Sequence, residues 1–107
     1  MQENTVIKAF HNRFPYFINQ NKIDYVKAYN GYVIIIADGK KFRSDESLSS
    51  ITSKLNPNLF FRINKSYTIN LNKLSNYRDH SILIQEEKIR IARSKYKTFD
   101  HILMSLD

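Results

Sequence analysis

The chain has 107 residues and carries 17 lysine and arginine residues against 10 aspartate and glutamate residues, a formal net charge of +7. Its length fits one domain and excludes a two-domain enzyme. It contains no cysteine, which excludes disulfides, thiolate zinc sites and a cysteine nucleophile.

Short strands separated by asparagine-rich turns are predicted for the first part of the chain. Apolar and β-branched residues favour strands over residues 6–10, 16–18, 23–29, 32–36 and 41–43. Asn30-Gly31 and Asp38-Gly39 predict two hairpins, and the first should form a type I′ turn with positive φ at both central residues. The unbroken apolar run over residues 32–36 predicts a strand buried on both faces.

An internal helix is predicted after these strands. Residues 44–47 offer hydroxyl caps with two carboxylates at the positive end of the helix dipole. Leu48, Ile51 and Leu55 recur at helical spacing before Pro57 ends the pattern. The outward positions carry no convergent chemistry, so we interpret this helix as structural.

Strands resume in the second half, over residues 60–63, 67–69, 74–78, 81–84 and 88–91, with a polar turn at 70–73. From Lys95 onward the apolar spacing changes to that of a short C-terminal helix. The predicted fold class is therefore mainly β, as a single domain over residues 1–107. No run of about 18 apolar residues occurs, so we expect no membrane segment and a cytoplasmic location.

Catalytic and metal-binding patterns are missing from the sequence. His11, His80 and His101 share no metal-ligand spacing, and Glu86-Glu87 falls in a predicted turn, where adjacent carboxylates are usually solvated. No glycine-rich phosphate loop or nucleophile elbow occurs. We therefore expect no enzyme activity, no metal, no cofactor and no small-molecule substrate.

The positive charge is concentrated in two stretches, residues 54–78 and 88–97, which hold ten of the 17 cationic residues and no acidic residue. Codon bias would scatter lysine without also removing carboxylates, so the pattern predicts an anionic partner, nucleic acid first. The first stretch contains Asn64, Lys65 and Ser66, whose groups suit phosphate and base-edge contacts. The second contains Arg93, which can fork onto guanine O6 and N7.

These two stretches resemble a known family. Residues 61–70 read FRINKSYTIN and resemble the F-x-R-x-H-x-S-(Y/F)-x-V-N signature of the LytTR DNA-binding domain, while residues 89–96 read IRIARSKY and resemble its I-P-V-S-R-x-Y close. The resemblance extends over about residues 17–103. It implies an elongated, mostly antiparallel β fold, the output module of bacterial response regulators in two-component systems. It also implies that loops, instead of a recognition helix, read double-stranded DNA.

The resemblance implies particular contacts, with three loops entering successive major grooves. The base-contacting residues would be Asn30, Tyr32, Asn64, Lys65 and Arg93. The phosphate-contacting residues would be Arg62, Lys65, Ser66, Lys73 and Lys95. Two positions depart from the signature, because Asn64 stands at the usual histidine and Ala92 at the usual serine. The resemblance further implies direct-repeat sites bound by two domains, and a receiver domain in the full-length regulator.

Two alternatives stay open. A small β domain with tyrosines such as Tyr25, Tyr29 and Tyr32 on a sheet face can stack the bases of RNA or single-stranded DNA. A protein-interaction module for an acidic partner would also use the charge. This second alternative gains if the two acid-free stretches lie on opposite faces of the molecule.

Overall fold

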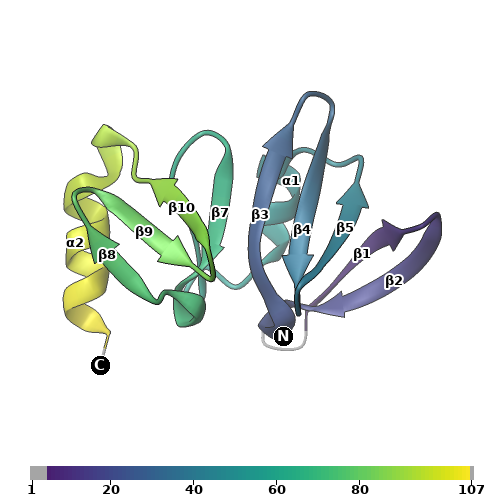
Figure 1. Cartoon of the computed structure of the whole chain (residues 1–107), viewed down its shortest axis with the longest axis horizontal. Helices are drawn as coiled ribbons and strands as arrows, with labels where there is room; N and C mark the ends of the chain where they lie inside the picture. The colour runs from purple at the N-terminus through teal and green to yellow at the C-terminus, as the bar shows by residue number, and fades with distance from the viewer. Residues whose placement is uncertain (1–4, 107) are drawn as a thin grey trace.

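The computed structural model describes residues 5–106, so the outermost residues of the predicted domain 1–107 lie outside the described part. The described residues form two sheets with two α-helices and three 3-10 turns (Figure 1). The strands are β1 (Val6–His11), β2 (Phe14–Asn19), β3 (Ile23–Tyr29), β4 (Tyr32–Ala37), β5 (Lys40–Ser44), β6 (Phe60–Arg62), β7 (Tyr67–Asn70), β8 (Asn76–Arg78), β9 (Ser81–Ile84) and β10 (Glu87–Arg90). The helical elements are η2 (Gln20–Lys22), α1 (Leu48–Lys54), η3 (Leu71–Lys73), η4 (Arg93–Lys95) and α2 (Tyr96–Ser105).

The larger sheet has seven strands in the order β2-β1-β5-β4-β3-β7-β6, and the smaller has three in the order β10-β9-β8. Neighbouring strands pair antiparallel throughout both sheets of the described chain. Figure 1 shows the smaller sheet and α2 at one end of the long axis and the β1–β2 hairpin at the other. The principal dimensions are 39 × 31 × 23 Å. The predicted fold class, mainly β with one internal and one C-terminal helix, is confirmed.

The turns follow the asparagine and glycine signals with one exception. Asp38 and Gly39 both have positive φ, 50° and 76°, as a type I′ turn requires. The type I′ prediction for the β3–β4 turn is wrong, because only Gly31 has a positive φ, +86°. A single positive φ at the second central position is the pattern of a type II turn, which glycine alone satisfies here without strain.

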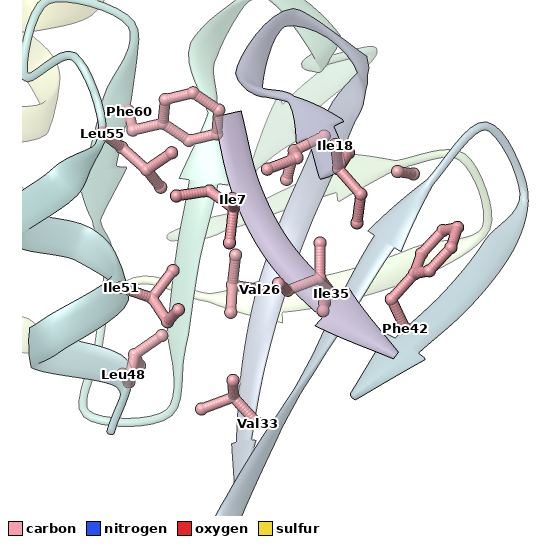
Figure 2. Packing of buried hydrophobic residues seen from close by; sticks show 13 residues of the cluster. Ile7, Ile18, Val26, Val33, Ile35, Phe42, Leu48, Ile51, Leu55 and Phe60 are labelled. Atoms are coloured by element: carbon pink, nitrogen blue, oxygen red, sulfur yellow. The ribbon is translucent and has the colours of Figure 1, made fainter. Parts of the chain in front are cut away.

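The first hydrophobic core lies between the larger sheet and α1 (Figure 2). Ser47 is the N-cap of α1, and its Oγ accepts a hydrogen bond from the Ser50 backbone N–H at 3.0 Å. The predicted apolar spacing is confirmed, since Leu48, Ile51 and Leu55 are all buried against the sheet. These three side chains hold the helix to the face that also buries β1.

Strand β4 corrects one expectation from the sequence. Val33 and Ile35 are buried in the first core, but Tyr32 and Ile34 are only half-buried on the opposite face. Most of the strand is therefore buried on one face only, and the prediction of burial on both faces is wrong for Tyr32 and Ile34. Apolar content alone does not distinguish the two cases. The open face of β3, β4 and β5 becomes part of the candidate site.

A second core joins the smaller sheet to β7 and α2. Ile69 on β7, Ile82 and Ile84 on β9 and Ile89 on β10 are each 0–1% exposed. Phe99 of α2 is also fully buried, and its ring centroid lies 5.6 Å from that of Phe61. This core positions the start of α2, and with it η4, beside β6.

Within residues 5–106, no helix has the length and apolarity to cross a membrane.

A buried carboxylate links the two sheets through a hydrogen bond. Asp24 of β3 is 3% exposed, and its carboxylate accepts a hydrogen bond of 2.6 Å from the Gln85 side-chain amide in the β9–β10 turn. Lys73 of η3 lies 3.9 Å from the other carboxylate oxygen. Burial raises the pKa of the Asp24 carboxyl above its ordinary value, although the Lys73 ammonium acts in the opposite direction.

Candidate nucleic-acid interface

Three loops meet at one end of the strands of the larger sheet, and we call this end the loop edge of the sheet. Strands β3 and β7 are antiparallel with Lys27 opposite Tyr67, so the end of β3 and the beginning of β7 lie at the same edge. The β3–β4 turn and the β6–β7 loop are therefore neighbours. The Ala28 backbone N–H donates to the Ser66 carbonyl at 2.7 Å and joins the two.

The Arg93 segment is attached to the same edge by the backbone. The Ala92 N–H donates to the Ile63 carbonyl at 3.0 Å, and the Ile91 N–H donates to the His80 carbonyl at 2.9 Å. Arg93 itself begins η4, immediately before α2. Backbone hydrogen bonding thus joins the segment that precedes Lys65 to the segment that precedes Arg93, one from each acid-free stretch.

Asn64 is fully engaged by the protein. Its Oδ1 accepts from the backbone N–H groups of Ser66 and Tyr67 at 2.7 and 2.9 Å, which closes the β6–β7 loop. Its Nδ2 donates to the Arg90 carbonyl at 2.6 Å, which ties that loop to the end of β10. An amide with these three bonds joins the two loops, and the base contact expected of Asn64 stays a prediction.

Arg62 also turns inward. Its guanidinium donates to the backbone carbonyls of Asn64 and Lys65 at 3.0 and 2.8 Å and to the Ser49 hydroxyl at 3.1 Å. The side chain therefore braces the loop from below and connects it to α1. A phosphate would have to compete with these bonds, and the phosphate contact expected of Arg62 stays a prediction.

Two expected contact residues keep their charged groups free. Lys65 and Arg93 are exposed, and neither side chain has a hydrogen bond, ion pair or aromatic contact within the described part of the chain. Lys95, half-buried on η4, lies over the Phe61 ring at 5.4 Å from its centroid. Ser66 is half-buried beside Lys65. All four sit at the edge that carries the three loops.

Lys73 lies elsewhere. It belongs to η3, which follows β7 at the end opposite the β6–β7 loop, and its ammonium pairs with Asp24. The acid-free stretch thus spans both edges of the sheet, because β7 carries the chain from one edge to the other. Residue spacing alone did not separate these two places.

The β3–β4 turn is supported by two stacked tyrosine rings with a cation over each, an arrangement that sequence reasoning missed. Tyr29 and Tyr32 flank the turn and stack with their planes at 6° and centroids 5.3 Å apart. The Arg43 guanidinium covers Tyr32 at 4.0 Å, and the Lys27 ammonium covers Tyr29 at 5.1 Å. Tyr32 is therefore occupied, and Asn30 is the exposed side chain of the turn. The cross-strand pair Tyr29–Tyr32 around Asn30-Gly31 was the available sequence signal.

Lys27 adds a permanent positive charge below this turn. Hydrogen bonding to Tyr67 raises the pKa of the Lys27 ammonium to about 12, against the opposing effect of burial. The Tyr67 hydroxyl in turn donates to the Glu87 carboxylate at 2.6 Å. Tyr67 is thus packed and hydrogen-bonded, in agreement with its place in an apolar alternation. Among residues 5–106, no group of three or more His, Asp and Glu side chains is placed to hold a metal ion.

Comparisons with known proteins agree with this geometry. The family model of the LytTr DNA-binding domain matches residues 15–104. The transcriptional regulatory protein LytR of Staphylococcus aureus strain N315 is 30% identical over 90 residues, which cover 78% of this chain and 37% of that protein. The sensory transduction protein LytR of Staphylococcus haemolyticus is 26% identical over 106 residues, 94% of this chain and 41% of that protein. The chain thus spans about two fifths of the length of these curated relatives.

Among solved structures, a LytTr DNA-binding domain of a response regulator from Bacillus cereus has a TM-score of 0.81 with this chain. The match covers 92% of this chain and 96% of that one at 19% sequence identity. At this identity the likeness is one of fold, and it includes the arrangement of strands that brings the three loops to one edge.

Proposed function

The chain belongs to the family of LytTr DNA-binding domains, and on this premise we propose that it reads double-stranded DNA through the three loops described above, as the output domain of a transcriptional regulator. The observation that carries the proposal is the pair Lys65 and Arg93. Both are exposed cations whose side chains have no partner among residues 5–106, and backbone hydrogen bonds hold both at one edge. Such groups suit the phosphate and base-edge contacts of a duplex.

The size of the domain limits how its loops meet DNA. One helical turn of B-DNA spans about 34 Å, and the longest dimension of the domain is 39 Å. A rigid domain lying along the duplex therefore faces two successive major grooves and not three. We assign the outer loops, with Asn30 and Arg93, to these grooves and Lys65 to the stretch between them. Arg93 would fork onto a guanine, whereas Lys65, Ser66 and Lys95 would contact phosphates.

The regulatory context is proposed from the relatives. Proteins named as transcriptional regulators match over about two fifths of their own length, so those proteins have room for a further domain. We propose that a receiver domain controls this output domain, that two such domains occupy a direct repeat, and that both act in the cytoplasm on chromosomal DNA. The absence of enzyme activity stays a prediction.

Single-stranded nucleic acid is the weaker candidate. Tyr25, Tyr29, Tyr32 and Tyr67 do gather on neighbouring strands, as that function requires. Base stacking needs free ring faces, but Tyr29 and Tyr32 cover each other and carry cations on their other sides. Competition between duplex and single-stranded DNA of one sequence separates the two candidates.

Selection of bound duplexes from a random pool, at a stated salt concentration, tests the proposal. The wild-type protein should bind the selected duplex more tightly than either of its separated strands. Arg93→Ala should weaken binding to it by about 1–3 kcal/mol and relax preference at one base position, because a forked contact to guanine is lost. Lys65→Ala should weaken all sequences alike and flatten the salt dependence by about one unit of slope.

Lys40→Ala is the matched control for both variants. Lys40 is exposed and carries the same charge as Lys65, but it begins β5 at the edge opposite the three loops. Its removal should leave site preference and salt slope unchanged. A random pool that yields no preferred duplex, or equal losses in Lys40→Ala and Lys65→Ala, would contradict the proposal.

A further inference from the structure

The β1–β2 hairpin exposes more large apolar side chains than any other element in the described chain. Of nine such exposed residues within 5–106, five lie on this hairpin: Val6, Phe10, Phe14, Tyr16 and Phe17. Phe14 and Phe17 are 67% and 68% exposed. A contiguous apolar patch of this kind on a small domain marks a binding surface.

The strand register places most of these side chains on one face. Val6, Lys8 and Phe10 alternate outward along β1, and Phe17 stands opposite Lys8 on β2. The other face of the hairpin is committed to the first core through Ile7 and its neighbours. We call the outward set the hairpin surface; it comprises Val6, Lys8, Phe10, Pro15 and Phe17.

A concave groove adjoins the hairpin surface. It has a volume of about 340 Å³ and lies between β2 and the β4–β5 turn. Tyr16, Phe17 and Phe42 contribute its apolar wall, and Lys22 and Lys40 stand among its polar residues. The Tyr16 and Phe42 rings meet edge to face at 5.4 Å, which keeps this wall rigid. A groove of this size holds one or two apolar side chains of a peptide.

The charge around the groove has one dominant sign. No acidic residue occurs from residue 5 to residue 23, and Lys8, Arg13 and Lys22 in that stretch have no ion pair in the described chain. Lys40 adds a further cation without an ion pair among the described residues, against the single carboxylate of Asp38 in the groove lining. The complementary ligand is therefore acidic as well as apolar.

The same observations disfavour a second copy as the occupant. Two hairpin surfaces would bring like charges together. Strand β2 is an edge strand, but Pro15 has no N–H to offer to an added strand, a device that blunts sheet edges. A lipid surface would use the exposed rings and cations but would leave the groove unfilled.

We propose that the hairpin surface and its groove bind a short acidic segment of another protein, anchored by one or two aromatic or aliphatic side chains. The site lies at the end of the long axis opposite α2 (Figure 1). Strand β1 also lies outside the family match, which begins at residue 15. The domain can therefore engage this partner while its three loops hold DNA.

A display library of random 12-residue peptides, panned on the full chain, supplies the probe. Enriched peptides should combine Asp or Glu with Leu, Ile, Phe or Trp, and a synthetic copy should bind more weakly as salt is raised. The double variant Phe10→Ser/Phe17→Ser should bind it at least about tenfold more weakly, because exposed anchors are removed from a small interface. Met104→Ser, which removes a side chain 86% exposed at the other end of the molecule, should bind like wild type.

Several results would overturn this assignment. They are enriched peptides without acidic residues, an unchanged affinity in the double variant, and displacement of the peptide by duplex DNA. Self-association that the double variant abolishes would assign the surface to a second copy. Binding to phosphatidylglycerol vesicles that the double variant abolishes, in place of peptide binding, would assign it to lipid. Duplex DNA should bind the double variant as it binds wild type. A failure of the peptide-binding proposal would therefore leave the DNA-reading proposal intact.

Discussion

Arg62 and Asn64 show how polar side chains in an exposed loop can be used by the loop itself. Together they make six hydrogen bonds to neighbouring backbone and side-chain groups. These bonds fix the carbonyl groups around Lys65 and leave its ammonium free. We therefore expect the two residues to affect DNA binding through the position of Lys65 and Arg93 instead of by contact.

Arg62→Met tests this division of roles. Losing three donated hydrogen bonds should lower the free energy of unfolding by about 1–3 kcal/mol, measured by urea denaturation. Binding to a selected duplex should weaken by a similar factor at every salt concentration, because no phosphate contact is removed.

The control is Lys88→Met, which removes an equal charge from an exposed position of β10. It should leave both stability and binding near wild type. A salt slope that falls by about one unit in Arg62→Met alone would return Arg62 to the phosphate-contacting set.

The sequence predicted which polar residues lie in the loops better than it predicted their hydrogen-bond and ion-pair partners. Asn64 bonds to a carbonyl 26 residues away, and Lys73 of η3 pairs with Asp24 of β3. No local pattern encodes such long-range contacts. What the sequence did predict is the loop that contains Lys65 and the isolated guanidinium of Arg93, since both follow from where alternation stops.

At the scale of elements, the β3–β4 hairpin is the most sharply defined of the three loops. Its turn depends on Gly31 at a φ of +86°, and the Tyr29–Tyr32 stack holds the two strands directly below. Nothing lies within 4 Å of a Cβ built at Gly31. A side chain there would meet backbone strain without a steric clash.

Gly31→Ala should therefore lower the free energy of unfolding by about 1–2 kcal/mol, the cost of a left-handed conformation for a residue with a Cβ. It should also weaken binding to a selected duplex, because relief of that strain moves Asn30. Gly39→Ala is the matched variant, with a φ of +76° and equally open space at the opposite edge.

Gly39→Ala should show the same loss of stability in urea denaturation with unchanged DNA binding. Equal binding losses in the two glycine variants would mean that the effect comes from global destabilisation. Unchanged binding in both would remove the β3–β4 turn from the interface.

Most elements were predictable because alternation, turn residues and capping are local signals. Strands β3, β4 and β9 and helix α1 lie within a residue or so of their predicted ranges, apart from the capping residues of the helix. The polar turn at 70–73 became the 3-10 turn η3, and β8 starts at Asn76, because residues there pack against the second core. The one-sided burial of β4 depends on which face another layer covers, and a single strand's composition does not contain that information.

At the scale of the whole molecule, two cores share the sheet formed by β3 and β7, and Asp24 lies where they meet. Its carboxylate is buried, and its pKa is raised by that burial. The native state therefore holds the proton more tightly than the unfolded chain does. The contribution of this group to the free energy of unfolding is largest below its ordinary pKa of 3.8 and falls as pH rises through the native pKa.

Asp24→Asn should remove this dependence while keeping an acceptor for the Gln85 amide. Relative to wild type, the variant should become progressively more stable between about pH 3 and pH 7, measured by urea denaturation at each pH. The Glu46 carboxyl, whose pKa is lowered by its hydrogen bond from Lys54, has the opposite effect, but it is present in both proteins and cancels. A constant difference across this range would contradict the raised pKa.

The exposed Asn30-Gly31 pair also makes the β3–β4 turn prone to deamidation. Glycine places no side chain in the way of its own backbone nitrogen, which can attack the Asn30 side-chain carbonyl, expel ammonia and close a succinimide ring. Hydrolysis of that ring leaves aspartate or isoaspartate, a new negative charge in a loop that we propose to face DNA. If this turn meets DNA as proposed, deamidation at Asn30 would weaken DNA binding by the domain without unfolding it.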